Sequence, residues 1–206
     1  MDGFERRTEE KKKRVLRAAF DLMNSDTGIE NLTIDDVAKK ANVGKTSIFK
    51  YFGSKENLIH EVFIRSMEEM GNNAKKVMAK NAPFEETLIA MSQVKIEYLD
   101  KINKQFYLDL MKYYTKKEDS GFTRMMEEYT KQSFGIMLDL FHRGRKEGKV
   151  DLKYSDEFLM LYFQAIIEGI SNPQIYEKIM PYTAEWTEML VKGIAPKNNP
   201  IDGSQF

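Results

Sequence analysis

Residues 32–58 read LTIDDVAKKANVGKTSIFKYFGSKENL and decide the fold of the N-terminal part of the chain. Thr33, followed by Asp36, is typical of a helix start, because a threonine hydroxyl caps the free backbone N–H groups there. The turn Asn42-Val43-Gly44 interrupts the pattern, and a second short helix is predicted over residues 45–52. Two short helices joined by a tight turn form the helix-turn-helix pattern, whose second helix enters the major groove of DNA.

The second helix of this pattern has two different faces. At about 100° per residue, one arc is apolar and can pack on the preceding helix, and it carries Ile48, Tyr51 and Phe52. The opposite arc carries Lys45, Thr46, Phe49 and Lys50, and Ser47 flanks it. Lysine can bind guanine O6 and N7 or a phosphate, threonine and phenylalanine can contact a thymine methyl, and a serine hydroxyl can bind a phosphate. The pattern predicts a surface that reads DNA.

The charge distribution favours the same interpretation. The chain has 32 Lys and Arg against 32 Asp and Glu, yet residues 6–17 alone hold seven of the cations and two glutamates. A basic stripe beside a helix-turn-helix is typical of phosphate binding. A purely structural interpretation, without DNA binding, stays open. The helix-turn-helix is also a common packing unit, and a basic terminus can simply be a solvated face.

The whole chain predicts an all-α protein. Its 206 residues fit one domain or two small ones. No proline precedes Pro83 and no stretch alternates with period two, so no strand is predicted. Helices are expected from Thr8, over 122–146, over 158–170 behind a Ser155 cap, and over 184–194, with a connection bracketed by Pro173 and Pro181. No apolar run approaches the roughly 20 residues of a membrane span, and the polar start lacks a secretory segment, so we expect a cytoplasmic protein.

Residues 32–58 resemble the signature of tetracycline-repressor-type (TetR) regulators, and the resemblance covers roughly residues 8–62. It implies a three-helix helix-turn-helix DNA-binding domain over 1–53 and a helical ligand-binding and dimerisation domain over 54–195. The segment 196–206 is polar and contains proline and glycine, so we expect a disordered tail there. The matching positions are Thr33, Ala38, Ala41, Val43, Ser47, Ile48, Phe49, Tyr51, Phe52, Ser54, Lys55, Glu56 and Leu58.

The resemblance also implies individual DNA contacts. Base contacts fall on Lys45, Thr46 and Lys50. Phosphate contacts fall on Thr33, Ser47, Tyr51 and Lys55. The chain departs from the family pattern at Gly44, where serine is usual, and at Phe49, where tyrosine is usual and its hydroxyl often meets phosphate.

Methionine and tyrosine are abundant in the second half, and together they suit an adaptable apolar pocket with polar handles. Core packing is the bland explanation for most of them. In the resembled family this domain binds a small inducer. The residues expected to line such a pocket are Met91, Tyr107, Met111, Met126, Tyr129, Met137 and Tyr162.

A homodimer interface is expected on the helices near 158–170 and 184–194. Leu159, Phe163, Ile166, Ile167 and Ile170 cannot all face one small core, and the resemblance implies the same interface. A two-fold dimer predicts a pseudo-palindromic operator.

No enzyme, metal site or cofactor is expected. Cysteine is absent, and the two histidines, His60 and His142, lie in no sequence with metal-ligand spacing. Gly44-Lys45-Thr46 resembles the end of a P-loop, but Lys39 stands where that motif needs glycine. The expected function is a ligand-responsive regulator, most simply a repressor, which a small apolar or amphipathic inducer releases from DNA. The alternative, motivated by Gly44 and Phe49, is a helical ligand-sequestering or interaction protein without sequence-specific DNA binding.

Overall fold

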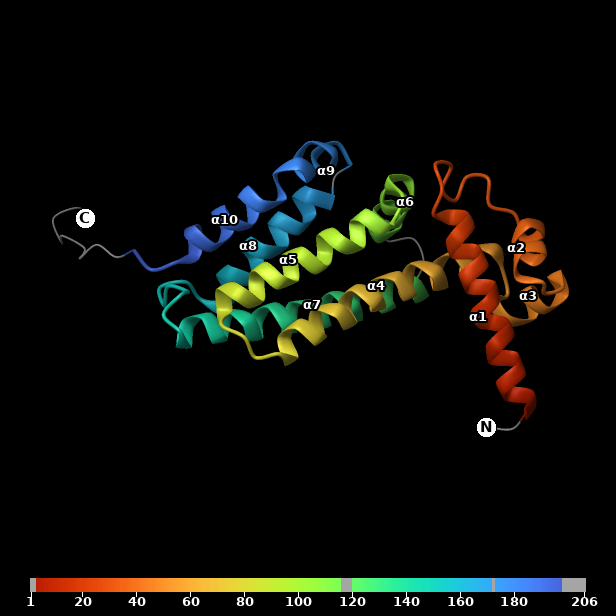
Figure 1. Cartoon of the computed structure of the whole chain (residues 1–206), viewed down its shortest axis with the longest axis horizontal. Helices are drawn as coiled ribbons and strands as arrows, with labels where there is room; N and C mark the ends of the chain where they lie inside the picture. Colours follow the sequence, from red (N-terminus) through yellow and green to blue (C-terminus); the bar gives the residue numbers. More distant parts are fainter. Residues whose placement is uncertain (1–2, 116–119, 172, 198–206) are drawn as a thin grey trace. The chain divides into compact units, whose positions relative to one another are not determined.

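A computed structural model describes residues 3–115, 120–171 and 173–197 of the chain (Figure 1). Within these ranges the secondary structure is helical and contains no strand, which confirms the all-α prediction. The elements are α1 Gly3–Met23, α2 Ile34–Ala41, α3 Lys45–Phe52, α4 Lys55–Ala79, α5 Phe84–Lys101, α6 Lys104–Thr115, α7 Ser120–Lys146, α8 Asp156–Ser171, α9 Pro173–Ile179, the 3-10 turn η1 Met180–Tyr182 and α10 Thr183–Ile194.

The chain forms two compact units, which are described separately. Unit 1 comprises Met1–Met70 and Glu97–Tyr129, and unit 2 comprises Gly71–Ile96 and Thr130–Phe206. Unit 1 therefore contains α1, α2 and α3 together with α6. The predicted functional boundary after residue 53 stays a prediction, and the predicted disordered tail lies mostly outside the described residues.

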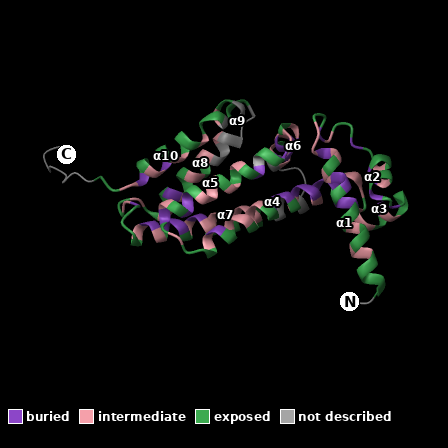
Figure 2. Ribbon diagram, viewed as in Figure 1, coloured by how far each residue is buried: buried purple, intermediate pink, exposed green. Residues whose placement is uncertain are grey.

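Helix α1 begins earlier than the sequence predicts. It starts at Gly3 rather than Thr8, because Glu5 favours the first turn and the ion pair between Arg6 and Glu10 stabilises the turn that contains Thr8. Figure 2 shows the N-terminal part of α1 mostly exposed, whereas its later turns bury an apolar face. That face, with Val15, Leu16, Ala18, Ala19 and Met23, agrees with the predicted stripe.

The helix-turn-helix is capped as its sequence indicates. The Thr33 hydroxyl accepts a hydrogen bond from the Asp36 N–H at 3.1 Å and donates to the Asp36 carboxylate at 2.6 Å. Asn42 adopts the left-handed conformation at φ 51°, which asparagine tolerates better than most residues. Gly44 stands at the N-cap of α3 and makes no side-chain cap, in line with its departure from the family pattern.

Unit 2 has a core made from four helices. Residues of α5, α7, α8 and α10 and of the turn before α8 form one apolar cluster, namely Phe84, Leu88, Met137, Leu140, Phe141, Val150, Leu159 and Ile194. Leu159, one of the apolar residues that could not all face one core, is a core residue, and Phe163 packs against this cluster. The segment between Pro173 and Pro181 is also helical rather than a plain connection, because a proline suits the first position of a helix such as α9.

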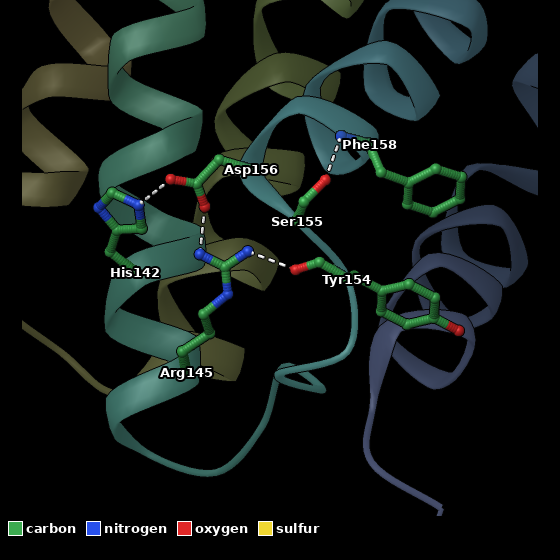
Figure 3. A network of polar contacts seen from close by, with 6 residues as sticks. All are labelled: His142, Arg145, Tyr154, Ser155, Asp156 and Phe158. Carbon is green, nitrogen blue, oxygen red and sulfur yellow. Dashed lines mark hydrogen bonds and ion pairs between the residues drawn. The ribbon is translucent and has the colours of Figure 1, made fainter.

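A polar network fixes the start of α8 on the end of α7 (Figure 3). His142 Nε2 lies 2.8 Å from Asp156 Oδ2, and Arg145 binds the other carboxylate oxygen. Arg145 also donates to the Tyr154 carbonyl at 2.7 Å. The hydrogen bond from His142 and, to a smaller extent, the one from Arg145 hold the pKa of Asp156 below its usual value. The network thereby stabilises the ionised carboxylate at the positive end of α8.

Candidate nucleic-acid interface

Helix α3 has the two faces that its sequence predicts. Ile48 is 1% exposed, and Tyr51 and Phe52 are half-buried. The opposite arc is exposed and consists of Lys45, Thr46, Phe49 and Lys50. Phe49 leaves 48% of its surface exposed to solvent. The exposed arc combines two cations, a hydroxyl and an aromatic ring on one side of a short helix.

The start of α3 offers backbone donors as well as side chains. The first N–H groups of a helix find no carbonyl within the helix, and they favour phosphate oxygens. The Ser47 N–H bonds to the Gly44 carbonyl at 2.9 Å, so it belongs to the helix. Gly44 provides no side-chain acceptor for the first N–H groups of α3.

An ion pair across the turn was not predicted from the sequence. The Lys45 ammonium binds the carboxylate of Asp35 in the first turn of α2, and both side chains are more than half exposed. An exposed pair of this kind contributes about 0–1 kcal/mol. Lys45 can therefore exchange Asp35 for a phosphate or a base at small cost. The only signal in the sequence for Asp35 as the partner of Lys45 is the acidic first turn of α2.

The remaining predicted DNA contacts lie at the edges of the same surface. Thr33 is exposed at the start of α2, and its hydroxyl is engaged with Asp36. The half-buried Tyr51 ring packs edge-on against Phe52 with ring centres 6.4 Å apart. Lys55 is half-buried at the first position of α4. The structure thus places the predicted residues on α3 and on the starts of α2 and α4, and their contacts with DNA stay predictions.

The basic stripe lies on the solvent side of α1 within the same unit. Most of its cations are exposed, and two of them pair with glutamates of their own helix, Arg6 with Glu10 and Lys12 with Glu9. Such i,i+3 and i,i+4 pairs between exposed groups are weak. The stripe therefore keeps a positive potential in the unit that holds the helix-turn-helix.

The predicted pocket residues fall in both units. In unit 1, Tyr107 is buried and Met111 and Tyr129 are half-buried. In unit 2, Met137 belongs to the core cluster and Met91 packs against it. The side chain of Met126 lies outside the described residues. Tyr162 is exposed on α8, so its surroundings are those of a surface residue. The pocket as a whole stays a prediction.

Helices α8 and α10 expose large apolar side chains. Tyr154, Phe158 and Tyr162 form a row of stacked rings, with centres 5.5 Å and 6.2 Å apart. Figure 3 shows Phe158 and Tyr154 on the side away from His142. The exposed apolar residues on α8, η1 and α10 are Phe158, Leu161, Tyr162, Tyr182, Trp186 and Met189. Of the apolar residues that the sequence analysis named on α8, Leu159 lies in the core, Phe163 packs against it and Ile166 is half-buried, and the side chains of Ile167 and Ile170 lie outside the described residues.

No helix among the described residues is long and apolar enough to cross a bilayer. The same residues contain no group of three or more histidine, aspartate or glutamate side chains placed to hold a metal ion.

The N-terminal region matches a known family. Residues 15–62, from the middle of α1 into α4, match the sequence model of the bacterial regulatory proteins of the tetR family. The chain is also 38% identical over 79 residues to YhgD, an uncharacterized HTH-type transcriptional regulator of Bacillus subtilis. That match covers 38% of this chain and 41% of YhgD. Both findings confirm the resemblance that residues 32–58 carry.

Solved structures with the same fold cover most of the chain. The regulator FadR of Bacillus subtilis, solved in complex with stearoyl-CoA, superposes with a TM-score of 0.69 at 17% identity, covering 88% of this chain and 98% of FadR. The reduced form of Escherichia coli NemR gives 0.69 at 15% identity, covering 92% of this chain and 100% of NemR. At these identities the likeness concerns the fold.

Proposed function

We propose that this chain, whose N-terminal domain is that of a TetR-family regulator, is a ligand-responsive DNA-binding transcriptional regulator that acts in the cytoplasm as a homodimeric repressor. One observation carries the proposal. Helix α3 is anchored by the buried Ile48 and turns Lys45, Thr46, Phe49 and Lys50 to solvent. A short helix with this division of faces can enter a major groove without disturbing its own packing.

The contacts divide into two classes. Lys45, Thr46 and Lys50 meet base edges, and Phe49 lies against a thymine methyl. Phosphates are bound around them by Thr33, Ser47, Tyr51 and Lys55 and by the first N–H groups of α3. The phosphate contacts fix the register of α3 in the groove, and the base contacts select the sequence.

A two-fold dimer would present two copies of α3 to one operator. The exposed apolar side chains of α8 and α10 support this assembly, because large apolar groups in solvent commonly mark protein–protein contacts. Tyr162 is assigned to this interface rather than to the pocket, since it stacks on the exposed Phe158. A closed dimer implies a pseudo-palindromic operator whose half-sites match the spacing of the two α3 helices.

The inducer is proposed to be a small apolar or amphipathic molecule. Methionine and tyrosine are residue types that suit an adaptable apolar lining, and α5, α6 and α7 each carry some of them. A relative in fold, FadR, was solved with stearoyl-CoA, an amphipathic ligand. The inducer would release DNA by favouring a state with wrongly placed α3 helices, and its effect cannot exceed its difference in affinity for the two states.

Fluorescence anisotropy of the full chain on labelled DNA from upstream of its own gene tests the proposal, with excess scrambled duplex as competitor. Lys50→Ala should weaken operator binding by about 5- to 150-fold if its base contact is worth about 1–3 kcal/mol. Lys80→Ala is the matched control, because Lys80 is an exposed lysine on unit 2. Saturable binding that survives the competitor and weakens only in Lys50→Ala supports sequence-specific regulation.

The alternative function is a helical ligand-sequestering or interaction protein. The uncapped start of α3 at Gly44 favours it, because a missing cap weakens the recognition helix. A Lys45→Ala/Lys50→Ala double variant separates the two functions. If the double variant binds every tested DNA and every ligand as the wild type does, the alternative is correct.

A further inference from the structure

Helix α6 contacts the loop between α1 and α2, residues 24–33. Within unit 1, Asp109 on α6 accepts a hydrogen bond from the Ile29 N–H at 2.9 Å, and its second oxygen accepts one from Gln105 at 3.0 Å. Asp109 is only 7% exposed. Burying an ionised carboxylate raises the free energy of the folded state unless hydrogen bonds replace its lost hydration. The hydrogen bonds from Ile29 and Gln105 therefore stabilise Asp109 in this buried position.

Gly28 makes the close approach possible. Its φ of +55° is a conformation that side chains rarely adopt, and a Cβ placed on it would lie 2.1 Å from Asp109 Oδ2. Any side chain at position 28 would therefore push the carboxylate away from the loop. Glycine at this position and aspartate on α6 form one interlocking contact.

A second set of contacts holds the beginning of the same loop. The Asn103 N–H, just before α6, donates to the Asn24 side chain at 2.5 Å. The Asn103 amide also donates to Asp26 at 2.8 Å. Phe106 on α6 is fully buried, and its ring packs on Phe20 of α1 at 5.2 Å between centres. The loop is thus tied to α6 at both its beginning and its middle.

The loop leads directly into the helix-turn-helix. It ends at Leu32, which is 4% exposed, and at Thr33, which caps α2. The internal hydrogen bonds of the loop are short-range turns, such as Gly28 N–H to the Ser25 carbonyl at 3.1 Å. These turns do not fix where the loop lies. The packing of α2 on α1 holds the two ends of the loop, and the contacts with Asp109 and Asn103 hold its middle and its beginning. A displacement of α6 must therefore either carry the loop along or break its hydrogen bonds to Asp109 and Asn103.

We propose that Asp109 is a positioning residue, which holds the loop 24–33 so that α2 and α3 stand in the orientation that binds DNA. A movement of α6 would then reach the helix-turn-helix through this contact. The inference rests on the proposed function and deepens it, because it names the residues through which the state of α6 controls DNA affinity.

The test uses the full chain and two readouts. Asp109→Asn removes the negative charge and leaves one acceptor oxygen, so Ile29 and Gln105 can no longer both donate to this side chain. Asp100→Asn is the matched control at an exposed position of unit 1. Hydrogen exchange of the DNA-free protein should speed up at residues 24–33 in Asp109→Asn, while the buried amides of Leu58–Phe63 keep their protection. Operator affinity should fall by about 5- to 150-fold, the usual range of coupling between two sites. The salt slope should not change, because no phosphate contact is lost.

A purely structural role would speed exchange throughout unit 1, and that result overturns the inference. Faster loop exchange with unchanged operator affinity also overturns it, as does no change in either readout. If Asp109→Asn fails to fold, Asn103→Ala removes the other contacts of the loop and must show the same local exchange and loss of affinity, or the inference is wrong. Absence of operator binding by the wild type would overturn the proposed function, and the exchange readout would still report whether Asp109 holds the loop.

Discussion

Thr33→Ala separates the two roles assigned to one hydroxyl. In the structure this hydroxyl accepts from the Asp36 N–H at 3.1 Å and so caps α2. In the proposed complex it also binds a phosphate. The substitution removes both contacts but changes neither the apolar face of α2 nor any charge.

The expected loss of stability follows from the cap alone. Replacing a threonine N-cap by alanine costs about 0.5–2 kcal/mol. The site is exposed, and Asp36 can still interact with the positive helix end, so the lower half of that range, about 1 kcal/mol, applies. For an unfolding unit of roughly 100 residues this corresponds to a fall of about 4–8 °C in Tm.

Three measurements on Thr33→Ala, Thr33→Ser and wild type make the test. Differential scanning calorimetry gives the change in Tm, and anisotropy gives the operator Kd and its dependence on salt. Thr33→Ala should bind more weakly with an unchanged salt slope, because a neutral hydroxyl releases no counterion. Lys50→Ala should lower the slope by about 0.9 if Lys50 also neutralises a phosphate. Thr33→Ser keeps the hydroxyl and should resemble wild type.

Each role can fail separately. An unchanged Tm in Thr33→Ala would show that the cap contributes nothing measurable. An unchanged Kd at a temperature where the variant is folded would remove Thr33 from the DNA interface. A salt slope that falls would mean that the variant lost a charged contact, and the structural reasoning about this residue would be refuted.

Three further predictions concern stability. Gly44→Ser should raise Tm, because a Cβ meets no atom within 4 Å there and serine supplies the missing cap of α3, worth about 0.5–1 kcal/mol; an unchanged or lower Tm contradicts this. Gly144→Ala should lower the free energy of unfolding in urea by about 1–3 kcal/mol, because the added Cβ would lie 2.6 Å from Val150 and 2.7 Å from Phe84 in the core. Gly135→Ala is the control and should not destabilise the protein, because its added Cβ meets no atom within 4 Å. The pKa of Asp156 is lowered in the folded protein, so the stabilisation from its ionised form is present above the ordinary carboxyl pKa and is lost as pH falls through the folded pKa. The difference in Tm between wild type and Asp156→Asn should therefore shrink in melts at acid pH. A difference that stays constant with pH would show that the network with His142 and Arg145 is not its cause.

Local patterns predicted the helix-turn-helix well. The cap at Thr33, the left-handed Asn42 and the exposed arc of α3 all follow from interactions among residues close in sequence. The start of α1 was missed, because a residue that can cap a helix does not oblige the helix to begin there: α1 starts at Gly3, with Glu5 in its first turn and an ion pair between Arg6 and Glu10 along it.

The exposed sides of α8 were not predictable in the same way. The segment 158–170 is apolar nearly all round, so helical periodicity gives no preferred face. The sequence indicated only that Leu159 and its apolar neighbours cannot all face one core, whereas the structure places Leu159 in the core and leaves Phe158 and Tyr162 exposed. Only the positions of α5, α7 and α10 decide which side of α8 is covered.

The sequence by itself determined that the chain is helical, that residues 33–55 form a helix-turn-helix and that Lys45, Thr46, Phe49 and Lys50 share its outer face. These features depend on backbone propensity, capping and a period of 3.6 residues, all of which act over a few positions. Tertiary structure alone decided that α6 belongs with α1–α3 and that Asp109 meets Gly28 and Ile29, about 80 positions away. No local pattern encodes such a contact, because it exists only where the packing of Phe106 brings two distant segments together.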